Sequence, residues 1–400
     1  MSNPQHQEEQ ISKKEYYSSQ APALPINSQE NENLSPFEAF MAKTKLEILQ
    51  IADQSKTAKS NKKHNSPPIT AFKDEASYLI IRPQTGWMLL IEKGEVILSE
   101  ISSLIGPTFL TFPDIIYSSR SNCYFLVEKW SRKIYRKDID KKPFYLYLSI
   151  DEKYSKLKKL IFSKKNQRLM ISTDKNKILF INLNRKKIES TLTHEGYIRD
   201  LCLLPEEETH LLILDTEFRL FTYRVFPSNG SQTILSQHSK IEDFYFWDLV
   251  GRWTLSVKLV PAHYKDRALV LILTLKRHQF TNATYLYVKT VEIQNGQILN
   301  VVTPGAWIDA WEVGGLQCCG FVDDHLIYHT WNTDAEFARA SSPLFVNVLG
   351  YDLGNNRIKN LEDMVVHCAQ IYPSELEKVG ENYFFMGNTD KVFELKSSNC

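Results

Sequence analysis

The chain has 400 residues and a formal net charge of +1, with 48 Lys and Arg against 47 Asp and Glu. This length exceeds one ordinary globular domain, although ring-like all-β folds reach it as one unit. The near-neutral balance excludes the strongly basic or acidic average of chains that bind nucleic acid or membranes through their whole surface. Apolar residues make up 43% of the chain, enough to bury a sizeable core.

The N-terminal region, residues 1–66, is rich in Gln, Asn, Ser, Lys and Glu. It offers too little apolar area to offset the entropy of ordering, so we expect a disordered arm. Within it, Ser35-Pro36-Phe37-Glu38 has the form of a capping box with Pro at the first helical position. Apolar residues follow at helical spacing, which predicts a helix over about 36–53. Two hypotheses stay open: a solvated helix, or one that docks its apolar stripe on a partner or on the rest of the chain.

From about residue 68, apolar runs of four to eight residues alternate with polar turns, as in β-strands. Apolar runs that begin at Tyr124, Leu169, Leu211 and Tyr383 are each followed by a short polar turn and a second apolar run. The first three starts lie 45 and then 42 residues apart, the period of a four-stranded unit repeated around a ring. Seven such units can be drafted, at 87–101, 115–148, 157–192, 198–235, 241–302, 307–361 and 365–395.

This pattern predicts an all-β fold, a seven-bladed β-propeller over residues 67–400, preceded by the arm and its helix. The last unit supplies only three strands before the chain ends, and a ring left open would expose an unpaired edge. The segment Ile69 to Phe72 is the expected donor of the missing outer strand.

The stretch Leu192 to Pro205, with His194 near its start, resembles the opening of a WD40 repeat, and Leu211 to Val225 resembles the second and third strands of that family. Thr193 stands where the family has Gly, and no Trp-Asp pair closes a third strand. The resemblance implies a structural hydrogen-bond pair between His194 and the turn residue Asp215. It also implies a non-catalytic platform for protein partners, often within a larger assembly.

Signatures of catalysis and of cofactor binding are missing from the sequence. The glycine-rich segment 314–320 lacks the Lys-Ser/Thr that grips phosphates, and neither G-x-S-x-G nor H-E-x-x-H occurs. One cluster has metal-binding residue types, although ordinary strand packing around a hairpin turn is the favoured interpretation: Cys318, Cys319, Asp323, Asp324, His325 and His329. We expect no catalytic residues, no cofactor, no metal and no small-molecule ligand.

Charge is unevenly distributed along the chain. Residues 129–187 hold nineteen Lys and Arg against five Asp and Glu, a net charge of +14, whereas residues 303–388 have a net charge of −8. Aromatic residues lie among the basic ones, as in many RNA-binding surfaces, although solvated lysines beside core aromatics would give the same pattern. The candidate surface for RNA or another anionic partner consists of Lys153, Lys156, Lys158, Lys159, Lys164, Lys165 and Arg168.

The cysteines and the chain's start bear on location. Six cysteines show no C-x-x-C spacing, which favours a reducing, intracellular compartment, the cytoplasm before the nucleus. The first ten residues lack the apolar core of a secretory signal. The longest apolar run, Ala268 to Leu273, is far shorter than the roughly 20 residues of a membrane span.

The sequence therefore favours a non-enzymatic scaffold or subunit of a larger assembly, which presents propeller loops and rims to protein partners. One alternative is an RNA-associated accessory subunit that uses the basic region 129–187. A second alternative is an enzyme with a site in the central channel.

Overall fold

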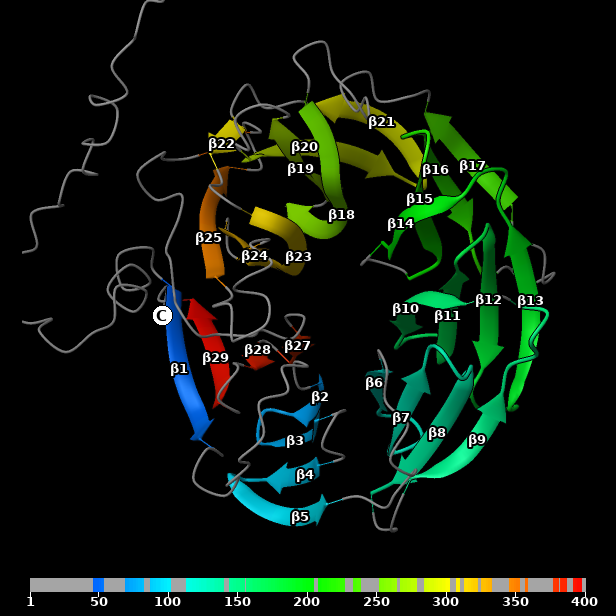
Figure 1. Ribbon diagram of the computed structural model, residues 1–400, viewed down its shortest axis with the longest axis vertical. Coiled ribbons are helices and arrows are strands. Elements are labelled where there is room, and N and C mark those ends of the chain that lie inside the picture. The colour runs from blue at the N-terminus through cyan, green and yellow to red at the C-terminus, as the bar shows by residue number, and fades with distance from the viewer. Residues whose placement is uncertain are drawn as a thin grey trace, which may run out of the picture. The chain divides into compact units, whose positions relative to one another are not determined.

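The computed structural model divides the chain into two compact units, Met1–Ser35 and Pro36–Cys400, and every described residue lies in the second unit. All of the regular elements among the described residues are β-strands (Figure 1). The structure describes residues 46–53, 69–82, 87–101, 113–139, 144–154, 156–204, 208–226, 233–238, 252–264, 267–278, 284–302, 307–309, 313–322, 325–332, 345–352, 357–358, 377–380, 382–386 and 391–397.

The described strands form seven antiparallel sheets, numbered here in chain order. Sheet 1 contains β2 (Ile69–Asp74), β3 (Ser77–Arg82), β4 (Trp87–Glu92) and β5 (Glu95–Ile101). Sheet 2 contains β6 (Pro113–Ser118), β7 (Cys123–Glu128), β8 (Lys133–Asp138) and β9 (Tyr145–Ser149). Sheet 3 contains β10 (Leu157–Ser163), β11 (Arg168–Thr173), β12 (Lys177–Asn182) and β13 (Lys187–Thr193).

The remaining sheets follow the same plan. Sheet 4 contains β14 (Ile198–Leu203), β15 (His210–Asp215), β16 (Leu220–Arg224) and β17 (Thr233–His238). Sheet 5 contains β18 (Arg252–Tyr264), β19 (Arg267–His278), β20 (Thr284–Gln294), β21 (Gln297–Val302) and β22 (Trp307–Asp309). Sheet 6 contains β23 (Val313–Val322), β24 (His325–Asn332), β25 (Phe345–Asp352) and β26 (Arg357–Ile358). Sheet 7 contains β27 (Glu377–Val379), β28 (Asn382–Met386), β29 (Lys391–Ser397) and β1 (Leu46–Asp53).

Within the second unit, the sheets follow one another around a central axis (Figure 1). The innermost strands of sheets 1 to 7 are β2, β6, β10, β14, β18, β23 and β27. Neighbouring inner strands contact one another, as in β10 with β14, β14 with β18 and β2 with β27. The second strands β7, β11 and β15 are almost completely buried because each lies inside a sheet that is covered on both faces. Apolar clusters fill the spaces between successive sheets, one joining sheets 2 and 3, the next joining sheets 3 and 4, and another joining sheets 4 and 5.

Sheet 7 is completed by the N-terminal strand of the unit. β1 pairs antiparallel with β29, from Leu46 opposite Ser397 to Asp53 opposite Lys391. The expected helix over 36–53 is therefore wrong for Leu46–Asp53, and the propeller begins before the expected boundary at residue 67. The rest of the expected arm, at 1–45 and 54–66, lies outside the described residues. The sheet edge of β29 offers backbone partners that outweigh a local helical spacing of apolar residues.

The donor of the missing strand was also expected in the wrong segment. Ile69 to Phe72 belongs to β2, which pairs with β3 as the inner strand of sheet 1. The expectation that the last sheet takes a strand from the N-terminal side is correct, but that strand is β1.

The drafted units 115–148, 157–192 and 198–235 match sheets 2, 3 and 4 to within a few residues. The unit drafted at 307–361 starts too early, because Trp307–Asp309 forms β22, which pairs with β20 in sheet 5. The described residues account for seven sheets, while seven blades for the whole chain stays a prediction.

Removing β1 tests the closure. Deletion of residues 1–53 leaves the outer edge of β29 unpaired, and we expect the midpoint of thermal unfolding to fall by at least about 5 °C. Deletion of residues 1–35 alone is the matched control, because this segment contributes none of the described strands, and it should leave the midpoint unchanged. Circular dichroism measures both, and an equal midpoint for the two deletions would contradict the role of β1.

Candidate functional site

A buried carboxylate joins the inner strands of three consecutive sheets. Asp200 on β14 is 3% exposed, and its Oδ1 lies 2.6 Å from the Lys159 Nζ of β10. Its Oδ2 accepts a hydrogen bond of 2.7 Å from the backbone N–H of Leu259 on β18. Because a buried carboxylate is stable only with such partners, this side chain fixes the relative positions of sheets 3, 4 and 5.

A second carboxylate makes the same kind of connection near the closure. Glu377 at the start of β27 accepts a hydrogen bond of 3.3 Å from the backbone N–H of Phe72 on β2. Its other oxygen lies 3.2 Å from the Lys164 Nζ, which comes from the turn between β10 and β11. Sheet 7 is thereby tied both to sheet 1 and to sheet 3.

Short polar side chains join the turns between first and second strands of neighbouring sheets. The Ser118 hydroxyl donates to Gln167 Oε1 at 2.5 Å, which links sheet 2 to sheet 3. Glu208 Oε2 accepts from the Ser163 hydroxyl at 2.7 Å and from the Lys165 backbone N–H at 2.9 Å, which links sheet 4 to sheet 3. These contacts satisfy polar groups that would otherwise be costly to bury.

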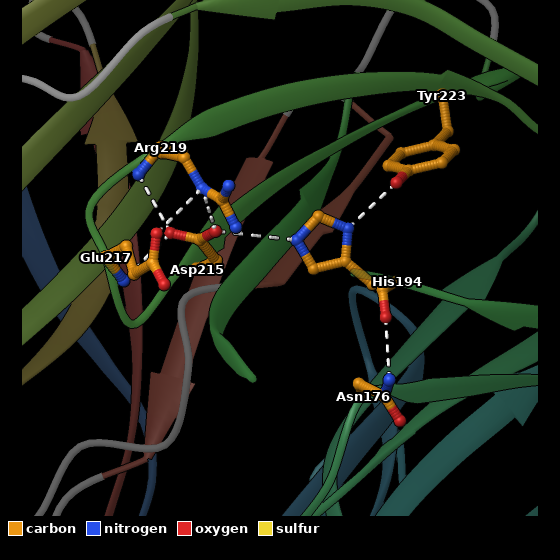
Figure 2. A network of polar contacts seen from close by, with 6 residues as sticks. All are labelled: Asn176, His194, Asp215, Glu217, Arg219 and Tyr223. Atoms are coloured by element: carbon orange, nitrogen blue, oxygen red, sulfur yellow. Dashed lines mark hydrogen bonds and ion pairs between the residues drawn. The ribbon is translucent and has the colours of Figure 1, made fainter. Parts of the chain in front are cut away.

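The structure brings His194 and Asp215 together, as Figure 2 shows. The two side chains are fully buried, and His194 Nε2 lies 3.8 Å from Asp215 Oδ2. On the other side of the ring, Nδ1 lies 2.8 Å from the Tyr223 hydroxyl. The 3.8 Å between Nε2 and Oδ2 is too long for the expected hydrogen bond, so the hydrogen bond of the ring is the one with Tyr223, whose hydroxyl donates when the neutral ring carries its proton on Nε2, facing the carboxylate.

The backbone of His194 belongs to the preceding sheet. Its N–H donates to the Asn176 carbonyl at 2.8 Å, and its carbonyl accepts from Asn176 Nδ2 at 2.7 Å (Figure 2). Asn176 lies in the turn after β11, whereas Asp215 and Tyr223 belong to sheet 4. His194 therefore connects sheets 3 and 4, its main chain bonded to one sheet and its side chain bonded to the other.

Asp215 also shapes its own turn. Its Oδ1 accepts from the backbone N–H groups of Glu217 and Arg219, each at 2.9 Å, and its Oδ2 accepts from Arg219 Nε at 2.7 Å. Gly196 packs closely beside it, since an added Cβ would lie 3.2 Å from Asp215 Oδ2, a tight contact. Every oxygen of this buried carboxylate is thus used for structure.

Burial controls the protonation of this network. Desolvation lowers the pKa of His194 below its usual 6.5, although the nearby Asp215 carboxylate acts in the opposite direction. Burial also raises the pKa of Tyr223 to about 12. The ring is therefore neutral and the phenol protonated near neutral pH, a state suited to a fixed hydrogen bond.

The seven basic residues of the candidate anionic surface do not form one patch. Lys153 and Lys156 precede β10, whereas Lys164 and Lys165 follow it. Seven residues of strand span about 23 Å, so these two groups lie near opposite ends of the sheet.

Most of these basic side chains have partners inside the chain. Lys159 and Lys164 contact Asp200 and Glu377, as described above. Arg168 Nε lies 2.6 Å from Glu189 Oε2, Lys153 Nζ lies 3.2 Å from Asp151 Oδ2, and Lys156 Nζ lies 4.2 Å from the centroid of the Trp130 ring. Lys158 and Lys165 are exposed. The hypothesis of an RNA or anionic surface stays a prediction.

Within the described residues, the structure shows neither a metal site nor a reactive thiol. No three His, Cys, Asp or Glu residues within the described ranges are placed to hold a metal ion. The side chains of Cys318, Cys319, His325 and His329 lie outside the described residues, as do Asp323 and Asp324. Burial raises the pKa of Cys123 to about 11 and that of Cys202 to about 12, which keeps both thiols protonated and poorly nucleophilic. No helix among the described residues is long and apolar enough to cross a bilayer.

Asp200, Glu208 and Glu377 were missed by reasoning from the sequence. Their partners lie between 41 and 305 residues away along the chain, so no local spacing marks them. The one available signal for Asp200 is an acidic residue in an inner strand whose other residues, apart from Arg199, are apolar.

Replacing Asp200 tests the tie between inner strands. Asp200→Ala leaves the Lys159 ammonium and the Leu259 N–H without their acceptor, and we expect the free energy of unfolding to fall by about 3 kcal/mol. Glu217→Ala removes an exposed carboxylate of the same sheet and should cost at most about 0.5 kcal/mol. Urea unfolding followed by tryptophan fluorescence measures both, and equal losses would contradict the role of Asp200.

Protonation of His194 should appear in the pH dependence of stability. Between the usual pKa of 6.5 and the lower pKa of the folded state, only the unfolded chain binds the proton, so stability present above pH 6.5 is lost as the pH falls. His194→Gln lacks this titration, and at neutral pH we expect it to cost about 1–3 kcal/mol, because the Tyr223 hydroxyl loses its ring acceptor. The difference in unfolding free energy between the two proteins should therefore shrink from about pH 7.5 to about pH 5.5. A constant difference across that range would refute the assignment.

Solved β-propeller domains are similar to this chain. The β-propeller domain of Nup133 from Vanderwaltozyma polyspora aligns with a TM-score of 0.55 at 12% identity, over 88% of this chain and 97% of that one. The WD40 domain of Pan2 from Neurospora crassa aligns with a TM-score of 0.49 at 14% identity, over 88% of this chain and 96% of that one. The β-propeller domain of Cps50 (Swd1) from Myceliophteria thermophila aligns with a TM-score of 0.44 at 10% identity, over 74% of this chain and 87% of that one.

No family model and no curated protein matches the sequence. At these identities a likeness shows the fold alone, and the alignment with the Nup133 domain spans 88% of this chain at a TM-score above 0.5. The prediction of a β-propeller from strand spacing is confirmed. The chain has a β-propeller fold.

Proposed function

We propose that this chain is a non-enzymatic interaction scaffold, a subunit that presents its outer strands and loops to protein partners. The observation that carries the proposal is the position of the exposed apolar side chains. Five of them lie on outermost strands: Ile97 on β5, Tyr145 and Leu146 on β9, Ile234 on β17 and Leu299 on β21. Exposed apolar groups at a free sheet edge favour contact with another protein.

β9 is the strongest candidate among these edges. Tyr145 and Leu146 are 42% and 50% exposed although adjacent strand residues point to opposite faces, so neither face of this end of β9 is covered. Among the described strands β9 pairs with β8 alone, so none of them occupies its other edge, to which a strand of a partner can add. Tyr147, two residues on, is buried and anchors the strand to sheet 3 through the Leu183 carbonyl.

The use of the polar groups supports a non-enzymatic role. The buried carboxylates Asp200 and Asp215 and the buried imidazole of His194 all contact groups that join sheets or shape turns. A catalytic acid or base must instead reach a substrate. Partners are therefore expected to be proteins that recognise shape and apolar area.

The RNA-associated alternative is less well supported. The region 129–187 has a net charge of +14, but ion pairs to Asp200, Glu377 and Glu189 occupy Lys159, Lys164 and Arg168. The remaining cations are divided between the two ends of β10, so no continuous basic track is formed by the candidate residues.

An intracellular location, the cytoplasm before the nucleus, is part of the proposal. Cys123 and Cys202 are free and buried, and neither forms a disulfide. Such thiols are common in proteins that fold in a reducing compartment.

Changing the edge of β9 tests the proposal. In the double variant Tyr145→Ser and Leu146→Ser, we expect the proteins that co-purify with the tagged wild-type chain to fall at least about 5-fold, because the exposed apolar area is lost. Quantitative mass spectrometry of cross-linked complexes measures the change. Lys187→Ala, at the start of the outer strand β13, is the matched control and should capture the wild-type set.

Thermal unfolding must first show that the double variant folds like the wild type. If the folded variant captures the same proteins in the same amounts, β9 is not a docking edge. If the wild type captures RNA after ultraviolet cross-linking and no protein depends on its outer strands, the scaffold proposal fails in favour of the RNA-associated alternative.

A further inference from the structure

The starts of β10 and β14 have the same geometry. The Asp174 backbone N–H donates to the Lys156 carbonyl at 2.7 Å, and the Thr216 N–H donates to the Tyr197 carbonyl at 2.9 Å, one residue before each strand. Both strands then carry a register shift at their second residue, after Leu157 in β10 and after Ile198 in β14. Lys158 and Arg199 therefore occupy equivalent positions at the same end of neighbouring sheets, and such bulges redirect side chains.

The residues after these bulges hold the two strands together. Lys159 follows Lys158, Asp200 follows Arg199, and the contact of 2.6 Å between Lys159 and Asp200 aligns the two inner strands. On the next inner strand, Lys258 precedes Leu259, whose N–H binds the same carboxylate. The three consecutive inner strands β10, β14 and β18 thus each carry a cation directly before the residue through which the strand contacts its neighbour.

Arg199 differs from Lys159, Lys164 and Arg168 because no carboxylate among the described residues pairs with its charge. The guanidinium carbon lies 4.8 Å from the centroid of the Phe218 ring, and within the part of the chain that the structure describes no carboxylate pairs with it. Burial lowers the pKa of Arg199. A half-buried guanidinium without a counter-ion is costly for the free protein and becomes favourable when an anion arrives.

Exposed groups lie at the same end of sheets 2 to 4 as this cation. Lys158 is exposed, and Tyr197 is 61% exposed in the loop before β14. In the neighbouring sheet, Trp130 is 47% exposed and its ring contacts Lys156. The end of sheets 2 to 4 therefore combines cations with aromatic side chains, the residue types that anchor peptides at interfaces.

We propose that Arg199, together with Lys158 at the equivalent position of the neighbouring inner strand, binds carboxylate side chains of an acidic peptide segment in a partner protein. The planar guanidinium forms two parallel hydrogen bonds with one carboxylate, while Tyr197 and Trp130 contact apolar residues that flank the acids. This inference rests on the proposed scaffold function and assigns it a second surface, distinct from the outer edge of β9.

The surrounding charges favour a peptide over a nucleic acid. The turns at this end also carry Asp174, Glu195 and Glu217. A nucleic acid has a negative charge at every nucleotide and would meet repulsion from these acids. A peptide with two or three acidic residues places its charges only where the cations lie.

Selection from a random 12-residue peptide display library on the immobilised full chain tests the proposal. We expect enriched peptides with at least two acidic residues. The most enriched sequence, made with a fluorescent label, should bind Arg199→Gln at least about 10-fold more weakly than the wild type and Lys158→Ala about 3-fold more weakly, by fluorescence anisotropy. Lys165→Ala is the matched control, because it removes an exposed lysine beyond the far end of β10, and it should bind like the wild type.

Thermal unfolding identifies the variants that fold, and Lys158→Ala keeps the test valid if Arg199→Gln does not fold. No enrichment, enriched peptides without acids, or equal binding by the wild type and the folded variants would overturn the proposal, as would Arg199-dependent binding of a labelled 20-nucleotide oligouridine in place of the peptide. If these results occur while protein capture still depends on the edge of β9, the inference fails and the scaffold function stands.

Discussion

Closure of the ring is the constraint on which the rest of the structure depends. Sheets 2 to 5 bury their faces against one another, and a single sheet of this kind is not stable alone, so the set depends on completion of the last sheet. The pairing of β1 with β29 provides this closure in sheet 7. Asp200 and Glu377 then fix the inner strands at two points of the circle, where each accepts a backbone N–H of the following sheet and a lysine of sheet 3 or of the turn after β10.

Much of the fold could be predicted from the sequence, for a definite physical reason. β7, β11 and β15 are short apolar runs bounded by polar turns because their sheets are covered on both faces, and that pattern is visible without a structure. β1 was predicted wrongly because a short amphipathic segment satisfies both periods, and only its partner β29, more than 300 residues away, decides between them. β22 was placed in the wrong sheet for the same reason, since its partner is the long strand β20.

Some residues of the candidate site could be predicted from the sequence and others could not. His194 and Asp215 could be paired beforehand because a repeat motif carries their spacing, and the structure places their side chains in contact distance. The basic residues could be counted but not placed, because a charge count does not show that β10 separates them or that Lys159 and Lys164 point to carboxylates of other sheets. Arg199 could not be found at all, since what distinguishes it is the lack of an acid in three dimensions among the described residues.

Lys159 and Arg199 have different roles at the end of the sheets where β10 and β14 begin. Lys159 is held in an ion pair that aligns the inner strands, whereas Arg199 has no carboxylate partner among the described residues. Lys159 binds the carboxylate beside Arg199, so the acid nearest to Arg199 along the chain is already occupied by Lys159 and by the Leu259 N–H. The tie that aligns sheets 3 to 5 thus also leaves the guanidinium uncompensated. Residues 129–187, which belong to the neighbouring sheets 2 and 3, have a net charge of +14, and residues 303–388 have a net charge of −8. An acidic partner segment would therefore be steered toward sheets 2 to 4 before any close contact forms, since fields of this kind act over roughly a Debye length of 8–10 Å.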